Sequence, residues 1–159
     1  MIFTRVVLAD DHAGLRSSIR TILEGAPDIA VVGEASDGLQ ALRLVEALAP
    51  DVLLLDMEMP GLEGVEVAQC LKAAGSPVRI LALSSYDDKQ YILGALANGA
   101  LGYLVKGEAP EKIVAAVRGV ARGERGWVSQ RAAAQLVTWD QEKKSQENRY
   151  NRDRGAHPQ

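Results

Sequence analysis

The sequence predicts an α/β protein built on a parallel sheet, and three observations support this. Short runs of leucine and β-branched residues alternate with longer stretches of helical spacing, which is the pattern of repeated strand–helix units. Hydrophobic residues make up 47% of the 159 residues and charged residues 25%, so a sizeable core can form. Aromatic residues are only 4%, and the core must therefore be packed from aliphatic side chains.

The first two strand–helix units occupy the start of the chain. A strand at Thr4–Ala9 ends in an acidic pair, and the helical spacing that follows ends at Gly25 and Pro27. A second strand is expected at Ile29–Ala35. Asp37 can cap the next helix, because its carboxylate can accept a hydrogen bond from a free backbone N–H. The expected apolar stripe of that helix comprises Leu39, Leu42, Val45 and Leu48.

The third unit contains the most continuous apolar run of the chain. Residues Asp51–Asp56 include Val-Leu-Leu-Leu and predict a central strand covered on both faces. A loop with Pro60 and Gly61 leads into a third helix. A fourth strand is expected at Val78–Leu83, followed by a short helix at Asp87–Asn98. The last unit consists of a strand at Ala100–Val105 and a helix at Pro110–Gly123.

The charge distribution and the single cysteine restrict the function classes. Residues 1–126 carry 12 basic and 17 acidic side chains, whereas residues 127–159 carry 6 and 4. The acidic body would repel a phosphate backbone, so we expect no direct nucleic-acid contact by this chain. Cys70 cannot form an intrachain disulfide, and no apolar run approaches the ~18 residues of a membrane span. We therefore expect a cytoplasmic protein with no membrane contact.

The chain changes character after Gly126. Ser129 is placed to cap a helical stretch that reaches Trp139, but no further strand pattern follows. From Asp140 to Gln159 there is too little apolar surface to offset the entropy cost of ordering. We expect one domain at residues 1–125 and a linker or tail at 126–159, partly helical and then disordered, or a helix extending alone or against another chain.

Four of the five expected strands end in polar side chains of the types that a phosphoryl-transfer site needs. These are Asp10 with Asp11, Asp56, Ser84 and Lys106. In an open parallel sheet the carboxyl ends of the strands meet at one edge, where ligands bind. Three carboxylates close together require a cation, and an all-oxygen ligand set favours magnesium. His12 is expected at the start of the first helix rather than on the metal.

Each of these residues also has a purely structural interpretation. The acidic pair could cap the first helix, Asp56 and Ser84 could belong to turns, and Lys106 could be a solvated surface residue. The occurrence of all of them at strand ends, in one chain order, favours a shared site for phosphoryl chemistry.

The motifs around these positions resemble the receiver domain of bacterial two-component response regulators. They are the acidic pair at 10–11, Leu-Leu-Leu-Asp-Met-Glu-Met-Pro-Gly around Asp56, Ser84, and Gly-Ala-Leu-Gly-Tyr-Leu-Val-Lys ending at Lys106. The resemblance covers about residues 4–123, and the stretch 98–103 is most similar to the NarL/LuxR-type subgroup. It implies a flavodoxin-like (CheY-like) fold, a doubly wound five-stranded parallel sheet of five βα units.

The resemblance also implies a function and a set of site residues. Asp56 would accept a phosphoryl group from a sensor histidine kinase, with Mg²⁺ held by Asp11 and Asp56, by Asp10 through water and by the main-chain carbonyl of Glu58. Lys106 and the Ser84 hydroxyl would contact the other phosphoryl oxygens. The chain would be a switch rather than an enzyme, catalysing only its own phosphorylation and dephosphorylation.

The resemblance also implies how the conformational switch works and which process it controls. Ser84 would move toward the phosphoryl group and Tyr103 would turn inward, shifting the population between two states. Phosphorylation would favour a homodimer and control transcription through a DNA-binding output domain. The residues after 123 are too few and too polar for that domain. We therefore expect either a chain cut before it or a stand-alone receiver with a tail.

Three residues depart from commoner receiver patterns. Gly107 follows Lys106 where many receivers have proline, so a cis X-Pro bond cannot aim the lysine. Ser85 stands where a small apolar residue is usual, and Glu58 places an acid beside the acceptor. We expect these changes to affect rates and phosphate lifetime rather than the capacity for phosphorylation.

Three other protein classes share some of these features. A haloacid-dehalogenase-type phosphatase would need an aspartate where Glu58 stands. A flavodoxin-like flavin binder would need a phosphate-cradling loop after the first strand, where Asp10 and Asp11 would repel phosphate. A pseudo-receiver acting only by protein contact would not require the acceptor, lysine and acidic pair that are intact in this chain.

Overall fold

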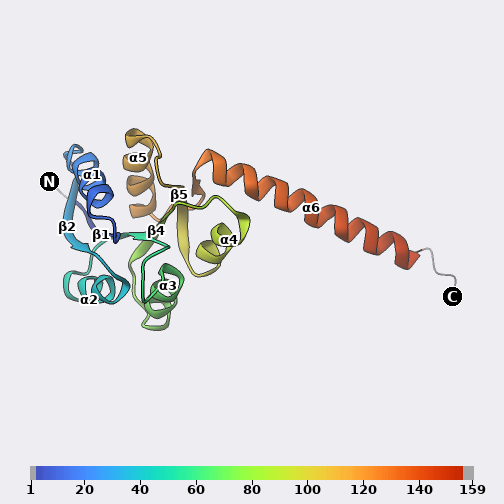
Figure 1. Ribbon diagram of the computed structural model, residues 1–159, viewed down its shortest axis with the longest axis horizontal. Coiled ribbons are helices and arrows are strands. Elements are labelled where there is room, and N and C mark those ends of the chain that lie inside the picture. The colour runs from blue at the N-terminus through green and yellow to red at the C-terminus, as the bar shows by residue number, and fades with distance from the viewer. Residues whose placement is uncertain (1–2, 156–159) are drawn as a thin grey trace.

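The computed structural model describes residues 3–155, apart from the side chains of residues 137–143 and 153–155. Within this range a six-stranded parallel sheet is covered by helices on both faces (Figure 1). The strands are β1 (Thr4–Ala9), β2 (Ile29–Ala35), β3 (Val52–Asp56), β4 (Arg79–Ser84), β5 (Ala100–Val105) and β6 (Trp127–Val128). The helices are α1 (Ala13–Glu24), α2 (Gly38–Leu48), α3 (Gly64–Ala73), α4 (Lys89–Ala97), α5 (Pro110–Ala121) and α6 (Gln130–Gly155).

The sheet has two hydrophobic layers, one on each face. Buried side chains of α1 and α5 pack on one face, and those of α2, α3 and α4 pack on the other (Figure 1). All five residues of β3 are buried because this central strand is covered on both sides. The strand order β2-β1-β3-β4-β5-β6 contains the flavodoxin-like order and confirms the predicted doubly wound fold.

The predicted elements of the body are confirmed, with one local error in an apolar stripe. Asp37 caps α2, accepting a hydrogen bond from the Gln40 backbone N–H at 2.8 Å. Leu39, which we placed on the apolar face of α2, is instead 52% exposed. It lies in the first turn of the helix, next to Gly38, which is one of the residues that α2 buries.

The strand pairings bring the carboxyl ends of four strands to one edge. Ala9 of β1 pairs with Leu55 of β3, so Asp10 and Asp56 follow side by side. Ser84, the last residue of β4, pairs with Val105 at the end of β5. The sheet register therefore collects the predicted polar residues at one place.

The sixth strand is a difference from the five-stranded sheet expected from the sequence. β6 has only two residues, too short to show a strand period, and it pairs with β5 through Gly102↔Trp127 and Tyr103↔Val128. Two glycines make room for it. A Cβ on Gly102 would lie 2.4 Å from the Trp127 carbonyl oxygen, and one on Gly119 would lie 2.0 Å from the Trp127 ring. Tertiary packing therefore forms this strand.

For the segment after β6 the sequence left two alternatives open, and over the described residues the structure has the second, a helix that extends alone, rather than a partly helical and then disordered tail. The structure has one helix, α6, from Gln130 to Gly155, which extends away from the body (Figure 1). Its second half is rich in Gln, Glu, Lys and Arg, which lose little side-chain freedom in a helix. Residues 156–159, also part of the expected tail, lie outside the described range. No helix within that range is both long and apolar enough to cross a membrane.

Candidate functional site

The structure brings the predicted strand-end residues together. Asp10, Asp56 and Ser84 are fully buried, while the side chain of Asp11 is 28% exposed and that of Lys106 12%. Each follows or ends a strand of the central sheet, so backbone pairing rather than local loop structure positions it. A cluster of this kind, with a charged amine among buried carboxylates, indicates a binding or reaction site.

The two oxygens of the Asp56 carboxylate have different partners, a backbone N–H for one and the Lys106 ammonium group for the other. Its Oδ1 accepts a hydrogen bond from the Glu58 backbone N–H at 3.0 Å. Its Oδ2 lies 3.2 Å from Lys106 Nζ, and the same Nζ lies 3.6 Å from Asp10 Oδ2. Asp10 Oδ1 accepts a hydrogen bond from the His12 backbone N–H at 2.8 Å. The chain thus orients both carboxylates and directs one oxygen of each toward the ammonium group.

Several buried carboxylate oxygens have no hydrogen-bond partner in the described part of the chain. They are Asp10 Oδ2, Asp11 Oδ1, Asp56 Oδ2 and Glu58 Oε2. Ligand atoms of Asp10, Asp11 and Asp56 lie within 4.8 Å of one another, together with a nitrogen of His12. Buried carboxylate oxygens without a hydrogen bond fit a hard divalent cation such as Mg²⁺, which prefers oxygen to imidazole. His12 is the N-cap residue of α1, the helix-start position predicted for it.

Burial and charge alter the proton affinities of the two central groups. Burial raises the pKa of the Asp56 carboxyl to about 6, and the nearby Asp10 charge adds to this, while the Glu58 N–H and Lys106 act in the opposite direction. For Lys106, burial lowers the pKa, but the Asp56 and Asp10 carboxylates outweigh it and the net direction is upward. Lys106 therefore stays protonated beside Asp56 at neutral pH.

Ser84 and Tyr103 are linked through the loop between β4 and α4. The Ser84 Oγ accepts a hydrogen bond from the Tyr86 backbone N–H at 3.0 Å, and the Tyr103 hydroxyl donates to the Tyr86 carbonyl oxygen at 2.6 Å. Tyr103 is fully buried, and burial raises the pKa of its phenol to about 12. The Tyr86 and Tyr91 rings stack on the surface with their centroids 4.7 Å apart, as expected for surface or packing residues.

Two contacts near the site were not predicted. Glu58 Oε1 accepts a hydrogen bond from the Ser85 backbone N–H at 2.7 Å, so this acid ties the end of β3 to the loop after β4. The Ser129 hydroxyl contacts the end of β5 and the loop beyond it, although the sequence suggested only a helix cap. In the sequence, the unusual polar residues Glu58 and Ser85 were a signal for the first contact. No sequence signal indicated the contacts of Ser129.

Lys106 is presented without a cis peptide bond. The residues of the described range contain no cis peptide, and Gly107 adopts φ +93°, a left-handed conformation that favours glycine. A proline at this position would be restricted to negative φ. The loop therefore aims the lysine by a glycine turn.

A protein-family comparison identifies the same region of the chain. The family described as "Response regulator receiver domain" matches residues 6–118. The nitrate/nitrite response regulator protein NarL of Escherichia coli (strain K12) is 41% identical over 119 residues, which cover 75% of this chain and 55% of that protein. The chain therefore spans about half the length of the curated relatives it matches.

Solved structures agree with the sequence match. The signal receiver domain of the putative response regulator NarL from Mycobacterium tuberculosis is 40% identical with a TM-score of 0.76, covering 78% of this chain and all of that one. A two-component response regulator of the LuxR family from Aurantimonas sp. SI85-9A1 is 30% identical with a TM-score of 0.81, covering 87% of this chain and 98% of that one. Both likenesses extend over the whole body of the fold.

Proposed function

Because this chain belongs to the family of response regulator receiver domains, with NarL- and LuxR-type relatives, we propose that Asp56 accepts a phosphoryl group from a phosphohistidine of a sensor histidine kinase. The observation that carries this proposal is the Asp56 carboxylate itself. It is fully buried at the strand edge, and its Oδ2 has no hydrogen bond but faces Lys106 Nζ at 3.2 Å.

In the proposed reaction an oxygen of Asp56 forms a bond to phosphorus while the bond from phosphorus to the imidazole nitrogen of the donor breaks. The imidazole leaves with the electron pair of that bond and takes up a proton. Lys106 neutralises one phosphoryl oxygen, and the Ser84 hydroxyl, whose oxygen accepts from the Tyr86 backbone N–H, donates its proton to another. A carboxylate is a weak nucleophile, so alignment and charge neutralisation carry most of the catalysis.

The buried oxygens of the acidic cluster that accept no hydrogen bond support a Mg²⁺ site. We assign Asp11 and Asp56 as direct ligands, Asp10 as a ligand through water, and the Glu58 main-chain carbonyl as a further ligand. When bound, Mg²⁺ supplies the positive charge that offsets the carboxylates and the incoming phosphoryl oxygens. Water attack on the aspartyl phosphate at the same site would then end the signal.

We also propose that Ser84 and Tyr103 form the switch. Both are bonded to Tyr86, so movement of the Ser84 hydroxyl toward a phosphoryl group would alter the loop that holds Tyr103 inward. Contacts available only in the phosphorylated state would shift the population toward one conformation.

The output of the switch is proposed from the relatives. LiaR of Bacillus subtilis, 39% identical over 120 residues, is named a transcriptional regulatory protein. We infer that the receiver controls transcription through a DNA-binding output domain and that phosphorylation favours a homodimer. It would act in the cytoplasm, where the ATP that a kinase uses is available.

Incubation with Mg²⁺ and acetyl phosphate, followed by intact-mass measurement, tests the phosphoacceptor. We expect a single phosphoryl adduct that hydroxylamine removes and that Asp56→Asn abolishes. Glu147→Gln, an exposed acid on α6, is the matched control and should be labelled like the wild type. A wild-type chain that stays unlabelled while a known receiver is labelled in parallel would overturn the proposal.

A further inference from the structure

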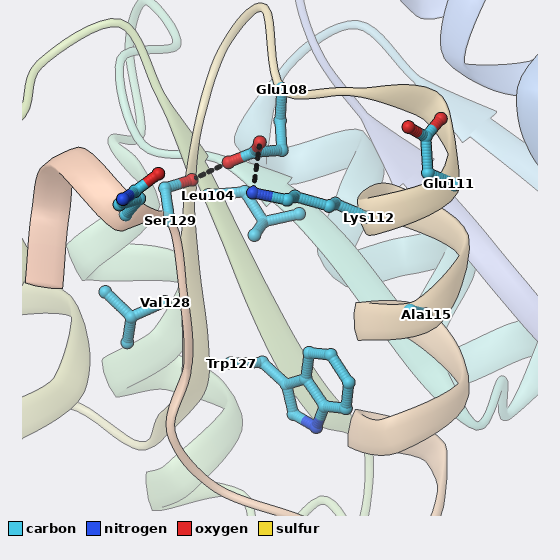
Figure 2. A pocket seen from close by; sticks show the side chains of 9 residues that line it. Leu104, Glu108, Glu111, Lys112, Ala115, Trp127, Val128 and Ser129 are labelled. Carbon is cyan, nitrogen blue, oxygen red and sulfur yellow. Dashed lines mark hydrogen bonds and ion pairs between the residues drawn. The ribbon is translucent and has the colours of Figure 1, made fainter.

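The junction between β6 and α6 lies against the end of β5, directly beside the residue that carries the site amine. Ser129 is 5% exposed, and its backbone N–H donates to the Tyr103 carbonyl oxygen at 3.0 Å. Its Oγ accepts a hydrogen bond from the Val105 backbone N–H at 2.9 Å and donates to a carboxylate oxygen of Glu108 (Figure 2). One side chain thus joins the end of β5 to the loop between β5 and α5.

Hydrogen bonds on both sides of β5 fix the backbone at Lys106. Val105 immediately precedes Lys106, and on the other side of β5 the Lys106 backbone N–H donates to the Ser84 carbonyl oxygen at 2.7 Å. β6 ends at Val128, so the Ser129 hydroxyl supplies the acceptor that a longer strand would have supplied to Val105. A buried N–H without an acceptor is costly, and the strand end would shift to satisfy it.

The first turn of α6 contacts the β4–α4 loop, which follows Ser84. Arg131 pairs with Asp87 Oδ2 through Nη2 at 2.9 Å and Nε at 3.2 Å. Asp87 is in the β4–α4 loop, next to Tyr86, which holds both the Ser84 hydroxyl and the Tyr103 phenol. Ala132, also in this turn, is fully buried in the hydrophobic cluster that contains Tyr103. Ser129 and the first turn of α6 together therefore contact both the β5–α5 loop and the β4–α4 loop.

We propose that Ser129 is a positioning residue for the phosphoacceptor site, acting through Val105 on Lys106, and that occupation of the site is coupled to the docking of α6. This inference rests on the proposed function of Asp56. The coupling is reciprocal, because a free-energy link between two places in a protein acts equally in both directions. When Lys106 binds a phosphoryl group, the end of β5 is held more firmly. Ser129 transmits this change from Val105 to α6.

Glu108, the other partner of the Ser129 hydroxyl, also has an ion pair that does not depend on Ser129. A pocket of about 430 Å³ opens between α5 and β6, lined by Glu108, Lys112, Trp127 and others (Figure 2). Lys112 Nζ lies 3.9 Å from Glu108 Oε1, so Glu108 keeps a partner when the Ser129 hydroxyl is removed. Ser129→Ala therefore removes the acceptor of the buried Val105 N–H, and it also removes one hydrogen bond to Glu108, which keeps its ion pair with Lys112.

The test compares Ser129→Ala with Ser145→Ala, which removes an exposed hydroxyl from α6. With acetyl phosphate and Mg²⁺, we expect Ser129→Ala to slow phosphorylation of Asp56 by about tenfold, while Ser145→Ala leaves the rate unchanged. The rise in melting temperature on adding Mg²⁺ alone should stay as in the wild type, because Ser129 contacts none of the carboxylates of the acidic cluster, Asp10, Asp11 and Asp56. Ser129→Thr, which keeps the hydroxyl, should recover the rate.

Amide hydrogen exchange of the wild-type chain decides the question even if Ser129→Ala folds poorly. With beryllofluoride and Mg²⁺ we expect slower exchange at Val105 and Ala133, and no change at residues 144–152 of α6. Equal phosphorylation rates for Ser129→Ala and wild type, or unchanged exchange at Val105 and Ala133, would overturn the coupling. Failure of the wild type to be phosphorylated would instead overturn the function of Asp56, so the two failures are distinguishable.

Discussion

The body of the fold and the distal half of α6 use charged residues in opposite ways. In the body, Asp10 and Asp56 are fully buried and share one ammonium group, Lys106. Along α6, residues 144–152 are all exposed to solvent. The helix carries acids and bases much as the body does, but the body buries some of them, and burial raises the pKa of Asp56 to about 6. Chemical reactivity here comes from burial and register rather than from the residue types alone.

The same contrast applies to what holds each region in place. Every strand of the central sheet is paired and packed on both faces, so its position depends on residues far away in the chain. The backbone of the distal half of α6 is satisfied by the hydrogen bonds of the helix itself, and the side chains of residues 144–152 face water. Substitutions should therefore have large effects in the body and small ones in the distal half of α6.

The largest expected effect is the loss of stability caused by a substitution in the hydrophobic core. Leu54→Ala, at a fully buried site in β3, should lower the free energy of unfolding by about 3 kcal/mol, because it leaves a cavity that a central strand cannot close. Leu136→Ala, at a partly buried site where α6 leaves the body, should cost about 1 kcal/mol. Urea denaturation measures both. Equal costs would mean that α6 is as firmly packed as the central sheet.

An intermediate effect concerns pH and the buried acid. The pKa of Asp56 is raised from 3.8 to about 6 by burial, so the folded state binds the proton more tightly than the unfolded state. The stability that protonation provides is present below about pH 4 and is lost as the pH rises through about 6. In a chelator at pH 7, Asp56→Asn should therefore be more stable than the wild type, by on the order of 2 kcal/mol.

Thermal or urea unfolding of both chains between pH 4 and pH 8 checks this. The difference between them should shrink toward pH 4, where the wild-type carboxyl is protonated. A difference that stays constant over this range would show that the Asp56 charge is not the cause. Adding Mg²⁺ should stabilise the wild type and narrow the gap at pH 7, since binding to the folded state alone raises its stability.

The smallest expected effects lie on the exposed half of α6. Glu147→Ala and Arg149→Ala should each change the free energy of unfolding by less than about 0.5 kcal/mol, because both side chains are exposed. Neither should alter phosphorylation of Asp56 by acetyl phosphate. A larger loss of stability in either variant would show that this part of the helix packs against something, for example a second copy of the chain.

Most of the body and the core of the site were predictable from the sequence. An apolar run that stops at Asp56, and others that stop at Asp10 and Lys106, show both a strand and the chemistry at its end. Parallel pairing then requires these ends to meet, so the cluster follows from topology. Leu39 was misplaced because a helical period does not reveal where the covering layer stops, and this residue is half exposed at the start of α2.

By itself, the sequence determined the α/β class, the order of the first five strand–helix units and the residues at their ends, because side-chain periodicity and local caps are properties of neighbouring residues. Only the tertiary structure decided β6, the Glu58 bond to Ser85 and the contacts of Ser129 with Val105 and Glu108. Each of these joins segments that are far apart in the chain or too short to show a period. Their formation depends on register and on the space left by Gly102 and Gly119, which the sequence does not display.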